Sequence, residues 1–233
     1  MTLFSTSPDK TRTIYLVIAT GCGLFVLLVL IAMLSYAGGS VDDHSTPGYS
    51  LTHSFLSTLG MVTSLSGEPN YLSALLFFLA LSTAGACLVI FFILFPRLFT
   101  RSRLQHGLAI TGSVFGVLAG TCFTGVAFTP ADLARPAHVQ FVIWAFRLFP
   151  LAVLFYVPVL FMDKDYPRRY AWVFAIFCLL LIAYYLLMTE GPSFDSPQGL
   201  VIQVIGQKVI AFASILCIGI QSWGAYRFLA SVD

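Results

Sequence analysis

The segment GVAFTPADLARPAHVQFVIWAFRLFP, residues 125–150, decides the fold of this chain. It opens on a polar turn around Thr129 and Asp132, and from about Ala137 it is an almost continuous apolar run. An apolar helix of about 20 residues is long enough to cross the hydrocarbon core of a bilayer. Arg147 stands inside this run, where a charged side chain is costly unless something compensates it, so we expect it to mark a functional position.

Composition places the rest of the chain in the same class. Of its 233 residues, 58% are hydrophobic and only 9% are charged, whereas soluble domains carry about 25% charged residues. The net charge of +2 is too small to indicate a nucleic-acid partner. We predict an all-α fold, a polytopic membrane helical bundle that forms a single domain over residues 1–233.

Apolar runs of sufficient length occur at six places in the sequence. The predicted transmembrane helices are 14–36, 71–95, 107–128, 137–162, 170–189 and 200–229. The first run is too long for a signal-peptide core and is not followed by a small-residue cleavage site, so we expect it to be retained.

The basic residues of the short loops predict the orientation. On one side of the predicted bundle lie Lys10, Arg12, Arg97, Arg101, Arg103, Lys164, Arg168, Arg169 and Arg227. The other side carries only Arg135. Because Lys and Arg accumulate in cytoplasmic loops, both termini are predicted to be cytoplasmic, in a multi-pass protein of the plasma (cell inner) membrane.

The longest outer loop, 37–70, contains apolar residues at three- and four-residue steps, namely Leu51, Phe55, Leu56, Leu59 and Val62. This spacing predicts a short amphipathic helix in the first outer loop. Such a helix either lies in the membrane interface or closes over the spans as a lid. A plain surface helix remains the alternative.

Two cations stand at matching depth inside the predicted spans. Arg147 and Lys208 each follow the outer end of their span by eight or nine residues, which is about 13 Å of helix. No Asp or Glu lies inside any predicted span. The charges can be compensated by snorkelling to the headgroups, by an acid of the outer loops, or by an anionic ligand such as a phosphate or carboxylate.

Amides and an aromatic residue share these two helices with the cations. Residues of this kind inside a membrane normally face other helices. We therefore predict a polar pocket, open to the outer leaflet, that binds an anionic lipid or amphiphile. The predicted ligand-binding residues are Arg147, Lys208, Gln140, Trp144, Gln203 and Gln207.

An interfacial enzyme, a lipid-head hydrolase or transferase, is the first alternative. Its catalytic candidates are His53, Asp132 and His138, because imidazole and carboxylate groups on the outer side can act as general bases. No HExxH, GxSxG or Cys/His metal spacing occurs, so neither a metal nor a cofactor is predicted. A structural or regulatory subunit of a membrane complex is the second alternative, and a homo-oligomer is left open.

Two short motifs add a resemblance. The stretch SFLSTLG followed by Asn70, and the turn GVAFTPAD followed by His138, resemble a six-helix membrane family catalogued as domain of unknown function 998. Thr129 interrupts the turn pattern of that family, and Thr58 stands where an acidic residue is often found, so no acid role at position 58 is supported. The family is similar in architecture to the FRAG/DRAM/SFK group, which implies a lipid-related role by analogy and supplies no catalytic residues.

Overall fold

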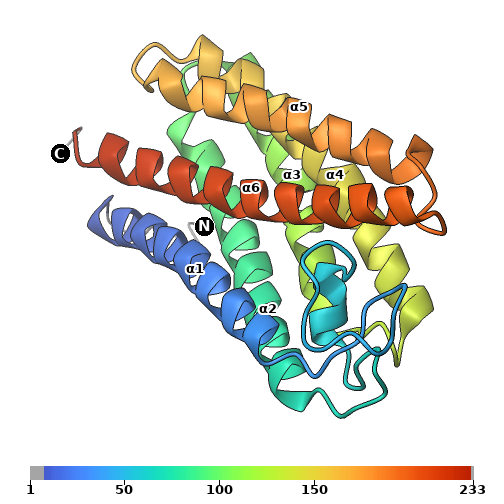
Figure 1. Cartoon of the computed structure of the whole chain (residues 1–233). Coiled ribbons are helices and arrows are strands. Elements are labelled where there is room, and N and C mark those ends of the chain that lie inside the picture. The colour runs from blue at the N-terminus through green and yellow to red at the C-terminus, as the bar shows by residue number, and fades with distance from the viewer. Residues whose placement is uncertain (1–7, 232–233) are drawn as a thin grey trace.

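The computed structural model of the chain describes residues 8–231 and is helical (Figure 1). The long helices are α1 (Pro8–Leu34), α2 (Tyr71–Leu94), α3 (Arg103–Ala127), α4 (Arg135–Met162), α5 (Arg168–Glu190) and α6 (Pro197–Leu229). All 6 are long and apolar enough to cross a membrane. The predicted all-α, multi-pass membrane architecture with six spans is therefore confirmed.

Several helices begin before the apolar runs that predicted them. Ser102 caps α3 by accepting a hydrogen bond from the Gln105 amide at 3.1 Å, and Ser196 caps α6 through the Gly199 amide at 3.1 Å. A serine at this position satisfies one of the amides that a helix start leaves without a partner. Hydropathy marks only the part of a helix that lipid surrounds, so it cannot detect these polar first turns.

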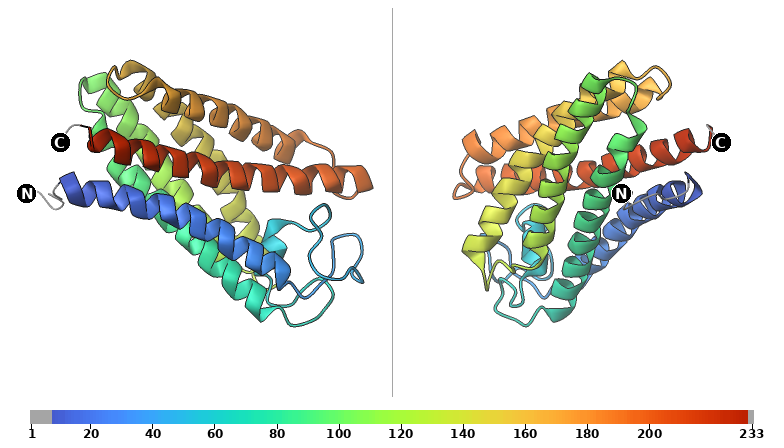
Figure 2. Two further views of the ribbon diagram at one scale, coloured as in Figure 1. Left: turned by 60° about the vertical axis from the view of Figure 1, so that its left-hand side comes forward. Right: turned by 180° about the vertical axis from the view of Figure 1, so that it is seen from behind.

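Helices adjacent in sequence pack side by side, and α6 packs against both α5 and α1, which closes the bundle into a ring (Figures 1 and 2). The start of α1 and the end of α6 lie at the same end of the bundle, where the Arg12 guanidinium donates to the Tyr226 hydroxyl at 3.1 Å. We call this the basic end. The opposite end, here called the loop end, carries the long connection between α1 and α2.

The α3 glycines allow its neighbours to approach closely. A side chain at Gly112 would meet the Tyr156 ring of α4 at 2.8 Å, and one at Gly116 would overlap the Phe92 ring of α2. Gly120 faces Gly85 of α2, with the Gly85 carbonyl only 3.0 Å from an added Cβ. The four-residue glycine spacing of α3 thus serves helix packing, as small residues usually do in membrane bundles.

Substituting Gly85 tests this packing. We expect Gly85→Ala to destabilise the bundle by about 1–3 kcal/mol, the usual cost of overpacking, because its Cβ would lie 2.9 Å from the Gly120 carbonyl and 3.0 Å from the Thr124 amide. The measurement is thermal unfolding in detergent. Gly23→Ala of α1 is the matched control, since an added Cβ there meets nothing within 4 Å. Equal melting temperatures for the two variants would contradict the close α2–α3 contact.

The amphipathic helix predicted in the first outer loop is not present. The only helix in this loop is the five-residue 3-10 helix η1 (Leu56–Gly60), and residues 51–54 form a turn. Leu56 and Leu59 are buried, which explains their helix-like spacing. A continuous helix does not form because the backbone amides on both sides of η1 donate their hydrogen bonds to side chains from elsewhere in the chain. The prediction was wrong at this point.

Candidate functional site

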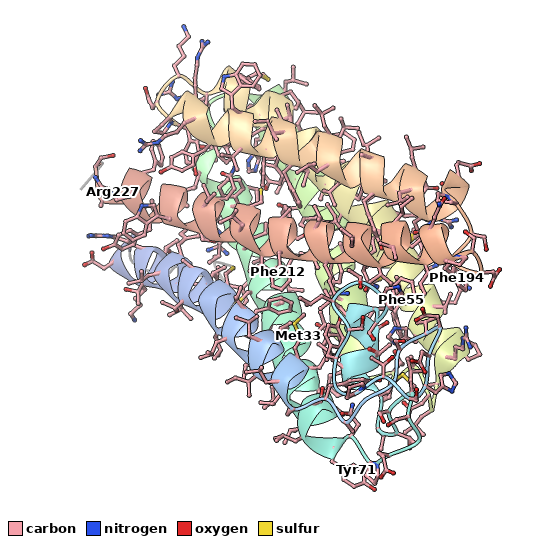
Figure 3. All side chains as sticks on the ribbon, viewed as in Figure 1. Met33, Phe55, Tyr71, Phe194, Phe212 and Arg227 are labelled. Carbon is pink, nitrogen blue, oxygen red and sulfur yellow. The ribbon has the colours of Figure 1, made fainter. Side chains whose placement is uncertain are left out.

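A cavity of about 580 Å³ lies at the loop end. There α4 and α5 separate, and the long loop and α6 cover the space between them (Figures 1 and 2). Its walls are Arg135, His138, Val139, Val142, Ile143 and Arg147 of α4, Tyr184, Met188 and Thr189 of α5, Gln203 and Gln207 of α6, Phe194 and Ala131 of two turns, and Val41, Phe55, Ser57, Thr58, Met61 and Leu65 of the loop. Phe55 and Phe194 meet edge to face, 6.4 Å apart, where the loop reaches the α5–α6 turn (Figure 3).

Arg147 contributes to the wall of this cavity, and its side chain is exposed on the surface of α4. Its guanidinium carbon is 5.5 Å from the centre of the Trp144 ring, one turn nearer the loop end. The side chain therefore points back along α4, as long helical side chains generally do. Within residues 8–231, no carboxylate oxygen lies within 4.0 Å of Arg147. The outer-loop acids thus do not neutralise this charge.

Lys208 has a different environment. Its side chain is buried, its ammonium donates a hydrogen bond to the Ser54 carbonyl, and it lies 5.1 Å from the centre of the Tyr49 ring. The Tyr49 hydroxyl donates to the same carbonyl at 2.9 Å, and burial raises the pKa of this phenol, which keeps it a donor. Lys208 therefore holds the loop against α6. It is not among the residues that line the cavity.

The other predicted ligand-binding residues also differ in position, because some line the cavity and others do not. Gln203 and Gln207 line the cavity, while Gln140 and Trp144 are exposed on α4 outside its lining. Gln207 Oε1 accepts from the Leu56 amide at 2.7 Å, and Gln203 Nε2 donates to the carbonyls of Leu187 and Pro192 at 2.8 and 3.1 Å. Each amide thus uses one polar atom to hold the chain, while its other polar atom has no hydrogen-bond partner among residues 8–231.

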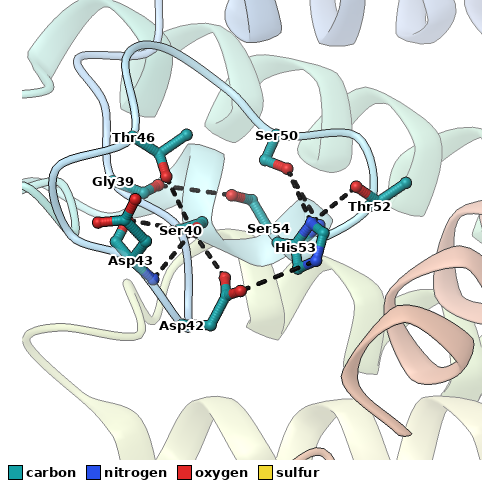
Figure 4. Close-up of polar contacts among 9 residues, drawn as sticks. All are labelled: Gly39, Ser40, Asp42, Asp43, Thr46, Ser50, Thr52, His53 and Ser54. Atoms are coloured by element: carbon teal, nitrogen blue, oxygen red, sulfur yellow. Dashed lines mark hydrogen bonds and ion pairs between the residues drawn. The ribbon is translucent and has the colours of Figure 1, made fainter. Parts of the chain in front are cut away.

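His53 belongs to a polar cluster in the loop (Figure 4). Its Nε2 lies 3.7 Å from Asp42 Oδ2, and its Nδ1 lies 2.7 Å from Thr52 Oγ1. Nearby, Ser40 Oγ donates to Asp42 at 2.8 Å, and hydrogen bonds from Ser45 lower the pKa of Asp43. These contacts fold the loop on itself, and His53 is not in the cavity wall.

Asp132 and His138 hold the turn before α4. Asp132 Oδ2 accepts hydrogen bonds from the amides of Val62 and Thr63 at 3.0 and 2.9 Å, while its buried Oδ1 has no partner within the described chain. His138 Nδ1 lies 2.7 Å from the Thr129 carbonyl, and its ring lines the cavity. Among the three catalytic candidates, then, no hydrogen bond or ion pair joins His53, Asp132 and His138, and only His138 lines the cavity.

Arg135 and Ser57 line the cavity but were not among the predicted site residues. Arg135, His138 and Val142 follow one another at steps of three and four residues, so one face of α4 carries these three. This spacing is visible in the sequence and could have identified Arg135. Nothing in the sequence could have identified Ser57, because only the fold of the loop brings it to the cavity.

Within the described chain, no group of three His, Cys, Asp or Glu side chains is placed to hold a metal ion. Comparison with known protein families, with curated proteins and with solved structures finds no match. The function is therefore inferred from the chemistry of the cavity.

Proposed function

We propose that the cavity at the loop end binds an anionic lipid or another anionic amphiphile. The observation that carries this proposal is Arg147, a guanidinium without an anionic partner in the described chain, in the wall of a cavity within a membrane bundle. A charge at this depth normally has a partner or a function. A guanidinium presents paired donors that match a phosphate or carboxylate, which makes the head of an amphiphile a suitable partner.

The remainder of the wall fits the same class of ligand. Arg135 stands at the start of α4, twelve residues before Arg147, which corresponds to roughly 18 Å along the helix. Apart from His138, the α4 wall between them is apolar, formed by Val139, Val142 and Ile143, and no Asp or Glu lines the cavity. Cations and apolar side chains without acids suit a molecule that has a negative head and a hydrocarbon tail.

The proposal includes the orientation of the bundle. Arg101, Arg103, Arg168 and Arg227 gather at the basic end, together with the start of α1, whereas Arg135 lies at the loop end. The positive-inside rule then puts the basic end and both termini in the cytoplasm of a cell whose plasma membrane holds the protein. With this orientation, the ligand enters from the outer leaflet. The lipid-related role that the family resemblance implies is consistent with such a site.

Lipid retained by the purified protein tests the proposal. We expect Arg147→Ala to reduce co-purified anionic lipid about 10- to 100-fold, the equivalent of the roughly 1.5–3 kcal/mol of a hydrogen bond to a charged group. Quantitative mass spectrometry of extracted lipid provides the measurement. Arg103→Ala is the matched control, because Arg103 is an exposed arginine in the first turn of α3, at the basic end.

Lys208→Met separates the two cations. If Lys208 only ties the loop to α6, this variant keeps the lipid that Arg147→Ala loses; if both cations hold the anionic head, both variants lose it. Identical lipid profiles for the wild type, Arg147→Ala and Arg103→Ala would contradict the proposed site.

A further inference from the structure

A second cavity adjoins the first. It has a volume of about 210 Å³, and its walls are largely apolar side chains of α2 and the end of α3, among them Leu75, Phe77, Phe78 and Val126. The two cavities have two wall residues in common, Ser57 and His138. A hydroxyl and an imidazole therefore each border both the cation-lined compartment and the apolar one.

The protonation of His138 follows from its contacts. The Thr129 carbonyl, 2.7 Å from Nδ1, can only accept a hydrogen bond, so Nδ1 carries the proton. The ring is buried and no carboxylate lies within 4.0 Å of it in the described chain, which disfavours a second proton. Nε2 is consequently a lone-pair acceptor, and no residue of the described chain donates to it.

Ser57 is held in place by the bonds on both sides of it. It lies in η1, whose first amide, that of Leu56, donates to Gln207 Oε1 at 2.7 Å. On the other side, the Met61 carbonyl accepts from Asn70 Nδ2 at 2.8 Å. The Ser57 hydroxyl itself has no hydrogen-bond partner among residues 8–231. The backbone of Ser57 is therefore fixed while its hydroxyl stays free to rotate about χ1. A serine nucleophile needs a hydrogen bond to its base, so this hydroxyl has to turn toward His138 Nε2 when substrate binds.

We propose that Ser57 and His138 are the nucleophile and general base of an acyl-transfer site that acts on a carboxylic ester of the anionic amphiphile. Three parts of such a site are present: a hydroxyl, a base that lines the same two cavities, and a third group, the Thr129 carbonyl, that fixes the tautomer of the base. This inference rests on the proposed function, since Arg147 would hold the head of the same substrate.

The steps balance with water as the second substrate. Ser57 Oγ forms a bond to the acyl carbon while its proton passes to His138 Nε2. The ester C–O bond then breaks, and the leaving alkoxide takes that proton and departs as an alcohol. Water, deprotonated by His138, attacks the acyl-serine, and the returning proton restores the Ser57 hydroxyl as the carboxylic acid leaves. Arg135 lies one helical turn before His138 in the same wall and can donate to the carbonyl oxygen as it becomes negative.

An alkyl fluorophosphonate tests the pair directly on the full chain in detergent, because its phosphorus forms a bond to an activated serine and releases fluoride. The expected result is a phosphonyl adduct on the wild type, located at Ser57 by peptide mass spectrometry. Ser57→Ala should abolish labelling, and His138→Gln should slow it by about 100-fold or more, the usual contribution of a general base. Ser66→Ala is the matched control, since Ser66 is a loop serine that lines neither cavity.

The outcomes separate this inference from the proposed function. Labelling depends on the serine–histidine pair, so Arg103→Ala, which changes an exposed arginine that lines neither cavity, should be labelled like the wild type. Wild-type protein that retains anionic lipid and is not labelled would overturn the serine–histidine pair and leave the binding site. Labelling that persists in a Ser57→Ala variant with an unchanged melting temperature would also overturn it.

Discussion

Asn70→Asp is expected to lower the thermal stability of the protein more than the other substitutions considered. Asn70 is 2% exposed, and its Nδ2 donates to the carbonyls of Leu59 and Met61 at 3.2 and 2.8 Å, while Oδ1 accepts from the Ala37 amide at 3.2 Å. An aspartate would lose both donor bonds and place a buried carboxylate against two carbonyl oxygens. At about 1–3 kcal/mol for each buried group that loses its partner, the loss is roughly 2–6 kcal/mol.

The measurement is thermal unfolding in detergent, followed by size-exclusion chromatography. Gln198→Glu is the matched control, because it makes the same amide-to-acid change at an exposed position in the first turn of α6. A negative charge near a helix start is favourable, so this variant should melt at or slightly above the wild-type temperature. If Asn70→Asp had the same melting temperature as the control, Asn70 could not be the residue that joins both ends of the loop.

Asp132→Ala should have the second largest effect, and a local one. Asp132 Oδ2 accepts from the amides of Val62 and Thr63, so its loss removes two charge-assisted hydrogen bonds between the loop and the α3–α4 turn. Each such bond contributes about 1.5–3 kcal/mol, which predicts faster exchange of these two amides by at least about tenfold. Hydrogen–deuterium exchange resolved to the 61–64 segment provides the measurement.

Two further variants sharpen this experiment. Asp132→Asn keeps an oxygen acceptor of the same shape and should restore most of the protection. Asp195→Ala removes an exposed aspartate of the α5–α6 turn, whose hydrogen bonds within the described chain are to Ser193, and should leave the 61–64 segment unchanged. Equal exchange in Asp132→Ala and Asp195→Ala would show that the loop is held without Asp132.

Both variants act on the wall of the cavity as well as on stability. Met61 lines the first cavity and Val62 lines the second, and both belong to the segment that Asn70 and Asp132 hold. A loosened loop would therefore change both compartments. Lipid retention and fluorophosphonate labelling of the two variants should be compared at temperatures where the protein remains folded, so that an effect on the site is separated from unfolding.

The sequence predicted the helices well because the membrane imposes their pattern. Every backbone amide and carbonyl in hydrocarbon needs an internal partner, so a run of apolar residues of the right length is a helix. The same reasoning selected Arg147, Gln203 and Gln207, and all three line one cavity, while their role in binding a ligand stays a prediction. It failed for residues 51–62, where a helix-like spacing of apolar residues came from burial in a folded loop.

Lys208 shows that the depth of a charged residue along its helix does not identify the partner of that charge. Its distance from the end of its helix matches that of Arg147, and the two were expected to share a pocket. The Ser54 carbonyl, which is more than 150 positions earlier in the chain, instead accepts the hydrogen bond of Lys208. Depth along a helix is a local property, whereas the partner of a buried charge depends on which distant segment covers it.

The amino-acid sequence by itself determined that this is a six-span helical membrane protein with an arginine at depth in its fourth span, because hydropathy and length act along a single helix. Only the tertiary structure decided that Arg147 lines a cavity, that Lys208 ties down the loop, and that Ser57 and His138 share a wall. These are contacts between segments far apart in the chain, and they depend on hydrogen bonds of the loop backbone that leave no periodic signal in the sequence.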